Sequence, residues 1–291
     1  MGRCGEGSQL RVAHVGPHFG EEPPITGQRG SGTVFFSGCS LKCSYCQNFQ
    51  ISHLGLGRSL SPGDLTGLIV GMIRRDRVHN VNFVTPDHFF PHVFEIVSRL
   101  RERGLDLPVV FNLSGYQALE WLERASNHAD IYLPDFKYAE QGLASALSTC
   151  RDYPGVALQA IAAMVRQKGF LDACGDRKPL ATKGVLVRHL ILPGHVENSL
   201  TALTCLFVEF GSHLPLSLMS QYHPVRHQKD APLNRFLKEE EFRQVYDHAL
   251  DLGFETIYVQ FPERDGRESA GSADFLPDFE RAEPFKGNEG G

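Results

Sequence analysis

Seven short apolar runs, separated by amphipathic segments, constrain the fold of this 291-residue chain more than any other feature. The runs are continuously apolar rather than alternating, as expected for strands that are covered on both faces of a parallel sheet. They comprise residues 33–38, 80–85, 107–115, 129–135, 184–192, 215–221 and 255–261. Alternation of such strands with helices predicts an α/β fold with right-handed crossovers.

Three of the intervening segments carry clear helix signals. Ser61 is expected to cap a helix that has Pro62 at its first position. A second helix is expected to end at Gly104, and a third to run from about Lys238 to Gly253. Their expected buried faces consist of Leu65, Leu68, Ile69, Met72 and Ile73, of Val93, Ile96, Val97 and Leu100, and of Phe242, Val245, Tyr246, Ala249 and Leu250.

Six or seven strand–helix units fit a partial or complete parallel (β/α) barrel. A doubly wound open sheet is the alternative, because periodicity does not report closure. In either architecture the functional site lies at the carboxyl ends of the strands. We expect an N-terminal extension over residues 1–30, a barrel domain over 31–261 and a mobile tail over 262–291, where periodicity is lacking and Gly, Pro and acidic residues are frequent.

Composition excludes several classes of protein. A net charge of −5 without a basic stripe argues against a nucleic-acid binder. No stretch approaches the roughly 18 apolar residues of a membrane span, and the first residues lack the apolar core of a signal peptide. We therefore expect a cytoplasmic protein without a membrane partner, in a compartment where thiols stay reduced. Seven cysteines, three of them within eight residues, then indicate metal binding rather than disulfides.

Cys39, Cys43 and Cys46 form the pattern C-x3-C-x2-C directly after the first predicted strand. Three thiolates at this spacing can bind three corners of a cubane and leave the fourth iron open, as a reactive metal site requires. The alternative is a zinc site with His53 as the fourth ligand, but structural zinc usually takes its ligands from two separated pairs. No second pair follows, and the later cysteines are interpreted as small core residues: Cys150, Cys174 and Cys205.

This cysteine pattern resembles the signature of the radical S-adenosylmethionine superfamily. Further segments, in the same order over roughly residues 10–260, resemble a group related to pyruvate formate-lyase activating enzymes. The segments are SGTVFFSGCSLKCSYCQNFQIS, VTPDHFFP, FNLSGY, DIYLPDFKY, VRHLILPG and MSQY. The resemblance implies the barrel of that superfamily, one [4Fe-4S] cluster on the three cysteines, and S-adenosyl-L-methionine as a second cofactor.

The resemblance also implies the reaction. The reduced cluster cleaves S-adenosylmethionine to a 5′-deoxyadenosyl radical, which abstracts a hydrogen atom from the substrate, while the protein orients the groups. We expect a one-electron donor such as flavodoxin or ferredoxin. The target is either a glycine of a glycyl radical enzyme or a small molecule, and no residue identifies it. A zinc-stabilised binding module is the remote alternative.

Nine residues are expected to bind S-adenosylmethionine by the same resemblance. Tyr45 matches the position that packs near the adenine, with a loop-anchoring tyrosine as the alternative. Thr85 and Asp87 stand where activating enzymes carry Gly-Gly-Glu, and their oxygens can accept from the methionine ammonium. A capping role is the alternative for both. Asn112 and Ser114 resemble the Thr-Asn-Gly segment of those enzymes, with a turn-forming asparagine as the alternative.

Four further residues complete that set. Asp135 and Lys137 match the Asp-Leu-Lys that ends the fourth strand in activating enzymes. Arg188 lies within an apolar strand, so it must face a carboxylate, because an unpaired buried charge is costly. We favour the methionine carboxylate over a structural partner such as Asp135. His223 resembles the histidine after the sixth strand, which would contact the ribose or the substrate, or would be structural.

The N-terminal segment is less informative. His18, Glu21 and Glu22 lie in HFGEEPPITG, which matches the same group, and a solvated loop is the default interpretation. Related chains carry further cysteines before the equivalent of Cys4. Because Cys4 alone cannot bind an extra cluster, we predict none.

Overall fold

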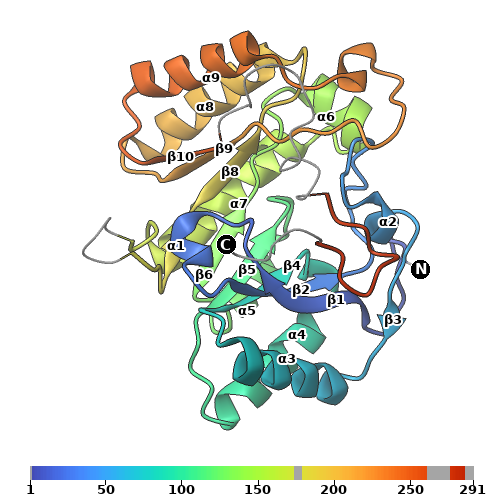
Figure 1. The fold of residues 1–291 in the computed structure, drawn as a ribbon. Helices are drawn as coiled ribbons and strands as arrows, with labels where there is room; N and C mark the ends of the chain where they lie inside the picture. Colours follow the sequence, from blue (N-terminus) through green and yellow to red (C-terminus); the bar gives the residue numbers. More distant parts are fainter. Residues whose placement is uncertain (1, 174–178, 261–275, 286–291) are drawn as a thin grey trace.

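The structure is a computed structural model that describes residues 2–173, 179–260 and 276–285 (Figure 1). The strands are β1 Arg11–His18, β2 Ser31–Phe36, β3 Arg58–Ser59, β4 Val81–Val84, β5 Val109–Leu113, β6 Ile131–Pro134, β7 Gly184–Val185, β8 Val187–Leu190, β9 Leu216–Met219 and β10 Ile257–Val259. The helices are α1 Pro23–Thr26, α2 Phe49–Ser52, α3 Pro62–Asp76, α4 Phe90–Glu102, α5 Leu119–Ala125, α6 Gln141–Ser148, α7 Tyr153–Lys168, α8 Val196–Phe210 and α9 Glu239–Leu252, with short 3-10 helices at Asp87–Phe89 and Ala231–Asn234.

The strands form a seven-stranded sheet of order β3-β1-β2-β4-β5-β6-β7 and a three-stranded sheet of order β10-β9-β8. Every pair from β2 to β7, and every pair from β8 to β10, is parallel. The predicted run 184–192 therefore contains two strands, one in each sheet. A bridge between Asp135 and Arg188 links the two sheets. Among the described residues no pairing joins β10 to the opposite edge, so the predicted α/β barrel is confirmed as a partial one.

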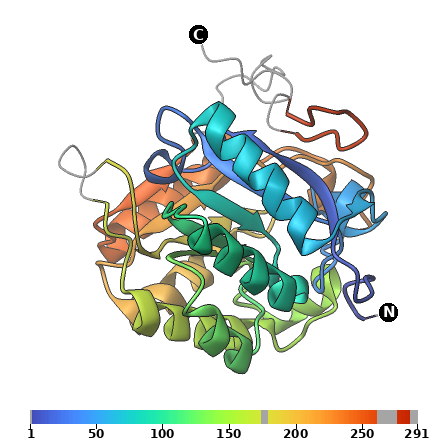
Figure 2. The same cartoon turned by 90° about the horizontal axis from the view of Figure 1, so that it is seen from below.

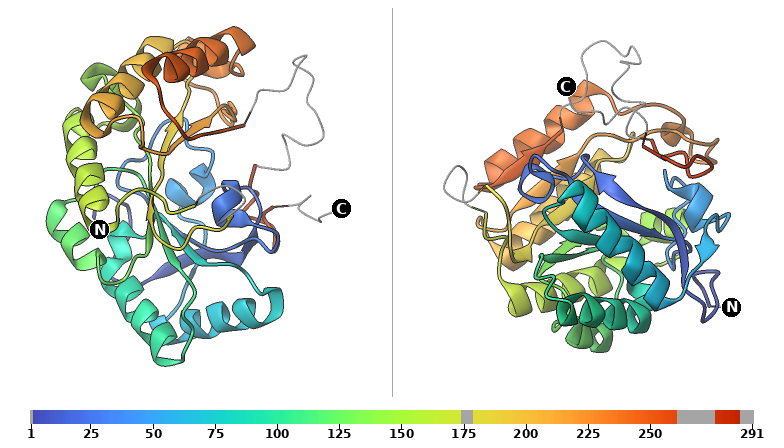
Figure 3. Two further views of the ribbon diagram at one scale, coloured as in Figure 1. Left: turned by 90° about the vertical axis from the view of Figure 1, so that its left-hand side faces the viewer. Right: turned by 60° about the horizontal axis from the view of Figure 1, so that its bottom comes forward.

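The longer helices lie along the outer side of the curved sheet, which leaves its concave side for the site (Figure 3). Seen from below, α3 and α4 run next to each other, and α3 lies over the part of the sheet that contains β1 and β2 (Figure 2). None of the helices in the described ranges is long and apolar enough to cross a membrane.

The predicted helix boundaries are confirmed where capping chemistry specified them. The Ser61 hydroxyl accepts a hydrogen bond from the Asp64 amide at 3.1 Å, and α9 ends at Gly253 in a left-handed conformation. The buried face of α4 consists of the four expected residues together with Phe90. Two predicted core residues are wrong: Leu68 is 38% exposed and Leu250 is 49% exposed. Both lie at the edge of an apolar stripe, where helical spacing does not tell the core from its margin.

The predicted N-terminal extension contains a strand of the main sheet. Strand β1 pairs antiparallel with β2, from Val12 opposite Phe36 to His18 opposite Ser31. The sequence of β1 mixes polar and apolar residues without strict alternation, so no strand was expected there. The chain then turns through α1 on the concave side of the sheet (Figure 1). This path brings the residues between β1 and β2 into the interior of the partial barrel.

Part of the expected mobile tail is packed against the sheet. In residues 276–285, Phe279 is 9% exposed and its ring centroid lies 5.5 Å from that of Phe35 in β2. The amide of Phe279 donates to Gln50 Oε1 at 2.9 Å, and Gln50 Nε2 donates to Asp278 Oδ1 at 3.2 Å. The rest of the expected tail after residue 260, and Cys174, lie outside the described residues.

Candidate active site

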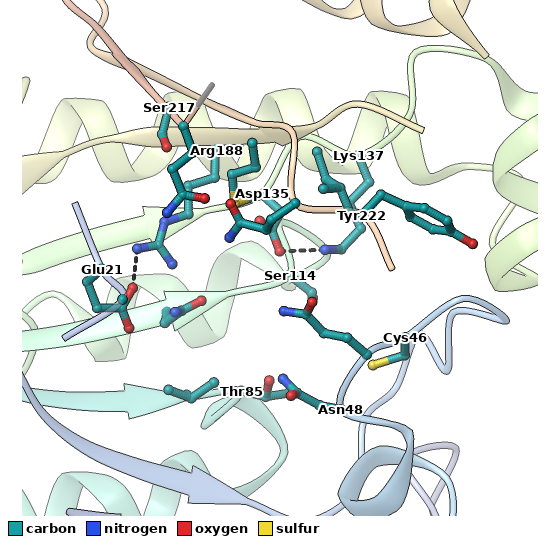
Figure 4. A pocket seen from close by; sticks show the side chains of 18 of the residues that line it. Glu21, Cys46, Asn48, Thr85, Ser114, Asp135, Lys137, Arg188, Ser217 and Tyr222 are labelled. Atoms are coloured by element: carbon teal, nitrogen blue, oxygen red, sulfur yellow. Dashed lines mark hydrogen bonds and ion pairs between the residues drawn. The ribbon is translucent and has the colours of Figure 1, made fainter. Parts of the chain in front are cut away.

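A cavity of about 560 Å³ opens inside the partial barrel (Figure 4). Eleven of the twelve predicted site residues line it. They are Cys39, Cys43, Cys46, Tyr45, Thr85, Asn112, Ser114, Asp135, Lys137, Arg188 and His223. The cysteines lie at one end and Glu21 at the other (Figure 4). Their contacts with a cofactor stay a prediction, but the fold brings them into one cavity.

The cysteine loop follows β2 and is held from several sides. Gly38, at φ +84°, allows the sharp turn, because a Cβ there would lie 3.0 Å from the Cys4 carbonyl oxygen. The Cys39 amide donates to that carbonyl at 3.2 Å, and the Ser44 amide donates to the Leu147 carbonyl at 2.8 Å. The Ser44 carbonyl accepts from Arg226 Nε at 2.8 Å. The loop is therefore preformed by contacts with distant segments.

The three thiols of this loop are the residues that could hold the corners of a cubane cluster. All three are free, and Cys43 is buried while Cys39 and Cys46 are partly buried. Burial, with the nearby Cys43, raises the pKa of Cys39 and of Cys46, so thiolates here need a compensating metal charge. Within the described ranges no group of three or more Cys, His, Asp or Glu side chains is arranged to hold a single metal ion. A cubane differs because each cysteine binds its own iron.

The zinc alternative finds no support in this geometry, because no group of three or more Cys, His, Asp or Glu side chains in the described ranges could hold a metal ion, and His53 does not line the cavity. His53 Nδ1 lies 2.9 Å from the Ser52 hydroxyl, which is also 3.4 Å from Cys46 Sγ. His53 thus interacts with the cysteine loop through Ser52.

Tyr45 anchors the cysteine loop, and its expected contact with an adenine stays a prediction. It is 6% exposed, and its hydroxyl hydrogen bonds to that of Tyr138 at 2.9 Å, which anchors the loop. The Tyr138 hydroxyl also forms a hydrogen bond of 2.6 Å with the Ser148 hydroxyl, and the Ser148 hydroxyl donates a hydrogen bond to Cys43 Sγ at 3.0 Å. The Tyr45 side chain also lines the cavity, where an aromatic face can pack against an adenine.

Asp135 and Lys137 form an ion pair of 2.5 Å at the end of β6. Burial opposes the charge on Lys137, but the neighbouring Asp135 outweighs it and the pKa of Lys137 is raised. The Tyr153 hydroxyl donates to the carbonyl oxygens of Asp135 and Ser114, each at 2.9 Å. Gly115 is needed between them, since a Cβ would lie 2.1 Å from the Asp135 carbonyl oxygen. The pair is thus held rigidly at the cavity wall.

Arg188 faces two protein carboxylates, and Asp135, the alternative partner, is not one of them. A contact with the favoured partner, the methionine carboxylate of the cofactor, stays a prediction. Arg188 Nε donates to Glu22 Oε1 at 2.8 Å, and Nη2 bonds to both Glu21 and Glu22. The guanidinium holds the pKa of Glu22 below its usual value, although burial opposes this. The two glutamates are not in a solvated loop: their side chains are 7% and 8% exposed. Asp135 is instead paired with Lys137.

The alternation of β8 explains why neighbouring residues differ. Arg188 points inward, whereas His189 is fully buried on the other face of the strand. The two ring nitrogens of His189 lie 2.6 Å from the Phe136 carbonyl oxygen and 2.9 Å from the Ser199 hydroxyl. Burial lowers the pKa of His189 to about 4. His189 is therefore a neutral structural residue.

Thr85 and Asp87 both follow β4, but only Thr85 lines the cavity. Thr85 lines the cavity at φ +54°, an unusual conformation for a β-branched residue, and its amide donates to the Asn112 carbonyl at 2.9 Å. Such strained residues cluster at functional sites. After Pro86 the chain enters a 3-10 helix, and Asp87 is not among the residues that line the cavity, so its contact with the cofactor stays a prediction. Burial raises the pKa of Asp87, although the nearby His88 and a hydrogen bond from Gln117 act to lower it.

Sequence reasoning gave no site role to Glu21, Glu22 or Ser217, all of which line the cavity. The sequence contained one indication of their role. The charge of Arg188 in an apolar strand implied a carboxylate partner, but any acidic residue in the chain could have been that partner. The partners lie 166 and 167 residues earlier in the chain, a pairing that only the fold reveals.

Comparisons with known proteins agree with this geometry. Residues 25–140, which include the cysteine loop, match the family described as the 4Fe-4S single cluster domain. The uncharacterised protein MJ0674 of Methanocaldococcus jannaschii is 27% identical over 249 residues, which is 83% of this chain and 67% of that protein.

Two solved structures share the fold. SuiB of Streptococcus suis, bound to S-adenosylmethionine, aligns with a TM-score of 0.53 and 11% identity over 77% of this chain and 48% of its own. A cysteine-to-serine mutant of spore photoproduct lyase aligns with a TM-score of 0.50 and 13% identity, over 77% of this chain and 74% of its own. The chain thus spans about half the length of SuiB. The chain therefore shares its fold with these two proteins, and its cysteine loop lies in the segment that matches the 4Fe-4S single cluster domain.

Proposed function

We propose that this chain is a radical S-adenosylmethionine enzyme with one [4Fe-4S] cluster on Cys39, Cys43 and Cys46. The observation that carries the proposal is the preformed loop of three free thiols at one end of a cavity. With both cofactors bound, the reduced cluster supplies the electron that cleaves S-adenosylmethionine to methionine and a 5′-deoxyadenosyl radical. SuiB, whose fold this chain shares, has been seen bound to that cofactor.

The protein's own residues would position the second cofactor beside the cluster. Tyr45 offers an aromatic face, and the polar atoms of Thr85, Asn112 and Ser114 lie along the same wall. The Asp135–Lys137 pair adds one acceptor and one donor of opposite charge. These groups come from the carboxyl ends of consecutive strands, where barrel enzymes carry their sites. Arg188 is held by two glutamates and is left out of this set.

For the target we propose a protein or peptide glycine, as in the activating enzymes that the sequence resembles, with flavodoxin or ferredoxin as electron donor in the cytoplasm. SuiB has also been seen bound to its precursor peptide SuiA, with a TM-score of 0.51 to this chain. A small-molecule substrate is the second candidate. It is favoured by Leu276, Pro277 and Phe285 of the C-terminal segment, which line the cavity and narrow the access of a large partner.

The test is anaerobic reconstitution with iron and sulfide, followed by electron paramagnetic resonance and product analysis. We expect a four-iron signal that changes on addition of S-adenosylmethionine, and slow release of 5′-deoxyadenosine with dithionite. Stoichiometric zinc without iron would refute the cluster. An intact reduced cluster that neither responds to S-adenosylmethionine nor cleaves it would refute the enzyme.

A further inference from the structure

The end of the cavity opposite the cysteines is built from ionised side chains. Glu21, Glu22 and Arg188 line it, and each of their side chains is at most 8% exposed. Arg188 bonds to both carboxylates, through Nε and Nη2. Two carboxylates and one guanidinium leave one net negative charge, in a place that is sheltered from water. A buried charge of this kind calls for a compensating cation.

No cationic side chain of the described residues supplies that compensation. The lysines and arginines that line the cavity are Lys137 and Arg188, and Lys137 is already paired with Asp135. His18 also lines the cavity, and burial lowers the pKa of its imidazole. Glu21 raises that pKa and Arg188 lowers it, with burial as the largest effect. The imidazole of His18 is therefore neutral near pH 7, and its Nδ1 has no partner among the described residues. The negative charge remains.

The hydrogen bonds at this end show the same imbalance. Asn82 is fully buried and donates through Nδ2 to Glu21 Oε1 at 2.9 Å, while its Oδ1 has no partner within the described structure. Among the other residues that line the cavity, Gln221 likewise has a buried Oε1 without a described donor. An acceptor that stays buried without a donor destabilises a fold. The charge at this end and the Gln221 acceptor in the same cavity therefore match a ligand that is positive and carries N–H donors.

Part of the cavity wall is apolar. Leu190, Met219, Ile257 and Val259 line the cavity, together with the ring of Phe35. Such a wall suits the methylene groups of an alkyl chain, whose burial is favourable. A substrate with a cationic head at the glutamates would extend its carbon chain toward the cysteine loop.

We propose that the Glu21–Glu22–Arg188 end of the cavity binds an ammonium or guanidinium group of the substrate. This inference rests on the radical enzyme proposed above and adds the chemical class of its substrate. The cation lies against Glu21, which holds it by a charge-assisted hydrogen bond. The carbon chain lies along the apolar wall, and its carbons face the end that holds the cluster.

The test uses the reconstituted protein and three probes of the same length. Titration calorimetry should show n-hexylammonium binding at least tenfold more tightly than n-hexanol, and no binding of hexanoate. A blocked lysine peptide forms a fourth arm: tighter binding of the peptide than of hexylammonium assigns the cation to a polypeptide, and the reverse assigns it to a small amine. Equal affinity for hexanol and hexylammonium overturns the proposal.

A variant pair locates the site. Glu21→Gln keeps the shape of the side chain and removes its charge, so it should bring hexylammonium affinity to within about threefold of hexanol. Glu209→Gln, an exposed change on α8, is the matched control and should leave the tenfold preference intact. An unchanged preference in Glu21→Gln overturns the assignment. If that variant does not fold, the probe series on the unchanged chain still decides.

Iron content and S-adenosylmethionine cleavage are measured on the same samples. Intact cleavage without a cation preference refutes only this inference, whereas loss of both iron and cleavage in the unchanged chain refutes the proposed enzyme.

Discussion

The hydroxyl oxygen of Ser148 lies 3.0 Å from the sulfur of Cys43, across 105 residues of sequence. Ser148 ends helix α6 and is 1% exposed, so its hydrogen bond to the sulfur is sheltered from water. Hydrogen bonds to cluster sulfurs raise the reduction potential of an iron–sulfur cluster, because they stabilise the more negative, reduced state. The position of α6 thus bears directly on the electron that the cluster can deliver.

Ser148→Ala should therefore lower the reduction potential of the reconstituted cluster by roughly 20–60 mV. This range follows from about 0.5–1.5 kcal/mol for one hydrogen bond and 59 mV per tenfold change in a one-electron equilibrium. A potentiometric titration followed by electron paramagnetic resonance measures it. Ser145→Ala, an exposed change on the same helix, is the control. Equal potentials in the two variants would contradict a role for the Ser148 hydroxyl.

The cysteine loop predicts a clear split among cysteine variants. Replacing Cys39, Cys43 or Cys46 with Ala should abolish the four-iron signal, because a cubane with two protein ligands is poorly held. Cys150→Ala and Cys205→Ala should keep it, since neither side chain lines the cavity. Cys174→Ala should also keep it, as the sequence predicts. Iron and sulfide analysis decides, and retention of the full signal in any of the first three variants would remove that cysteine from the site.

Arg188→Leu should destabilise the fold strongly, because it leaves Glu21 and Glu22 buried without their counter-ion. Breaking a buried ion pair from one side typically costs about 3–5 kcal/mol. At roughly 2–4 °C per kcal/mol for a chain of this size, the melting temperature should fall by roughly 10 °C. Arg243→Leu, which removes an exposed ion pair with Glu239 on α9, should change it little.

Adding Glu22→Gln to Arg188→Leu should recover part of that loss, since one uncompensated charge is removed. Affinity for S-adenosylmethionine is measured on the same variants. An unchanged melting temperature with weakened cofactor binding would return Arg188 to the cofactor site.

Glu241 predicts a pH dependence of stability in the acid range. Its pKa is lowered to about 2 by hydrogen bonds from Arg235 and from the Lys238 and Gly194 amides, although burial opposes the shift. A carboxyl with a lowered folded-state pKa stabilises the fold above its ordinary value of 4.5. That contribution is lost as the pH falls from about 4.5 to about 2.

Unfolding by urea at a series of pH values measures this contribution. Glu241→Gln should be less stable than the unchanged chain at pH 7, and the difference should shrink toward pH 2. Glu240→Gln, at an exposed neighbouring position, should show no such difference. A stability gap for Glu241→Gln that is constant with pH would assign the effect to packing rather than charge.

The sequence predicted the elements that local chemistry specifies. Seven continuous apolar runs predicted the strands of the partial barrel, because strands covered on both faces cannot alternate in polarity. Capping at Ser61 and the stop at Gly253 were predictable because both depend on neighbouring residues alone. By contrast, β1 was missed, since its mixed composition becomes a strand only when β2 offers it an antiparallel partner.

The residues of the candidate site show the same difference between what local sequence specifies and what distant contacts decide. The cysteines and most of the polar residues at strand ends could be named from the sequence, because a parallel fold gathers the carboxyl ends of its strands at one place. Asp87, which was named with them, lies in a 3-10 helix after Pro86 and is not among the residues that line the cavity, and spacing does not report such a turn.

By itself the sequence determined the class of fold, the cysteine loop and the demand of Arg188 for a carboxylate, since each follows from residues that are near one another in the chain. Only the tertiary structure decided that Glu21 and Glu22 meet that demand and that Ser148 reaches Cys43. The physical reason is that both contacts join segments more than 100 residues apart. Their geometry depends on how the sheet curves and where α1 and α6 pack, and no local propensity encodes it.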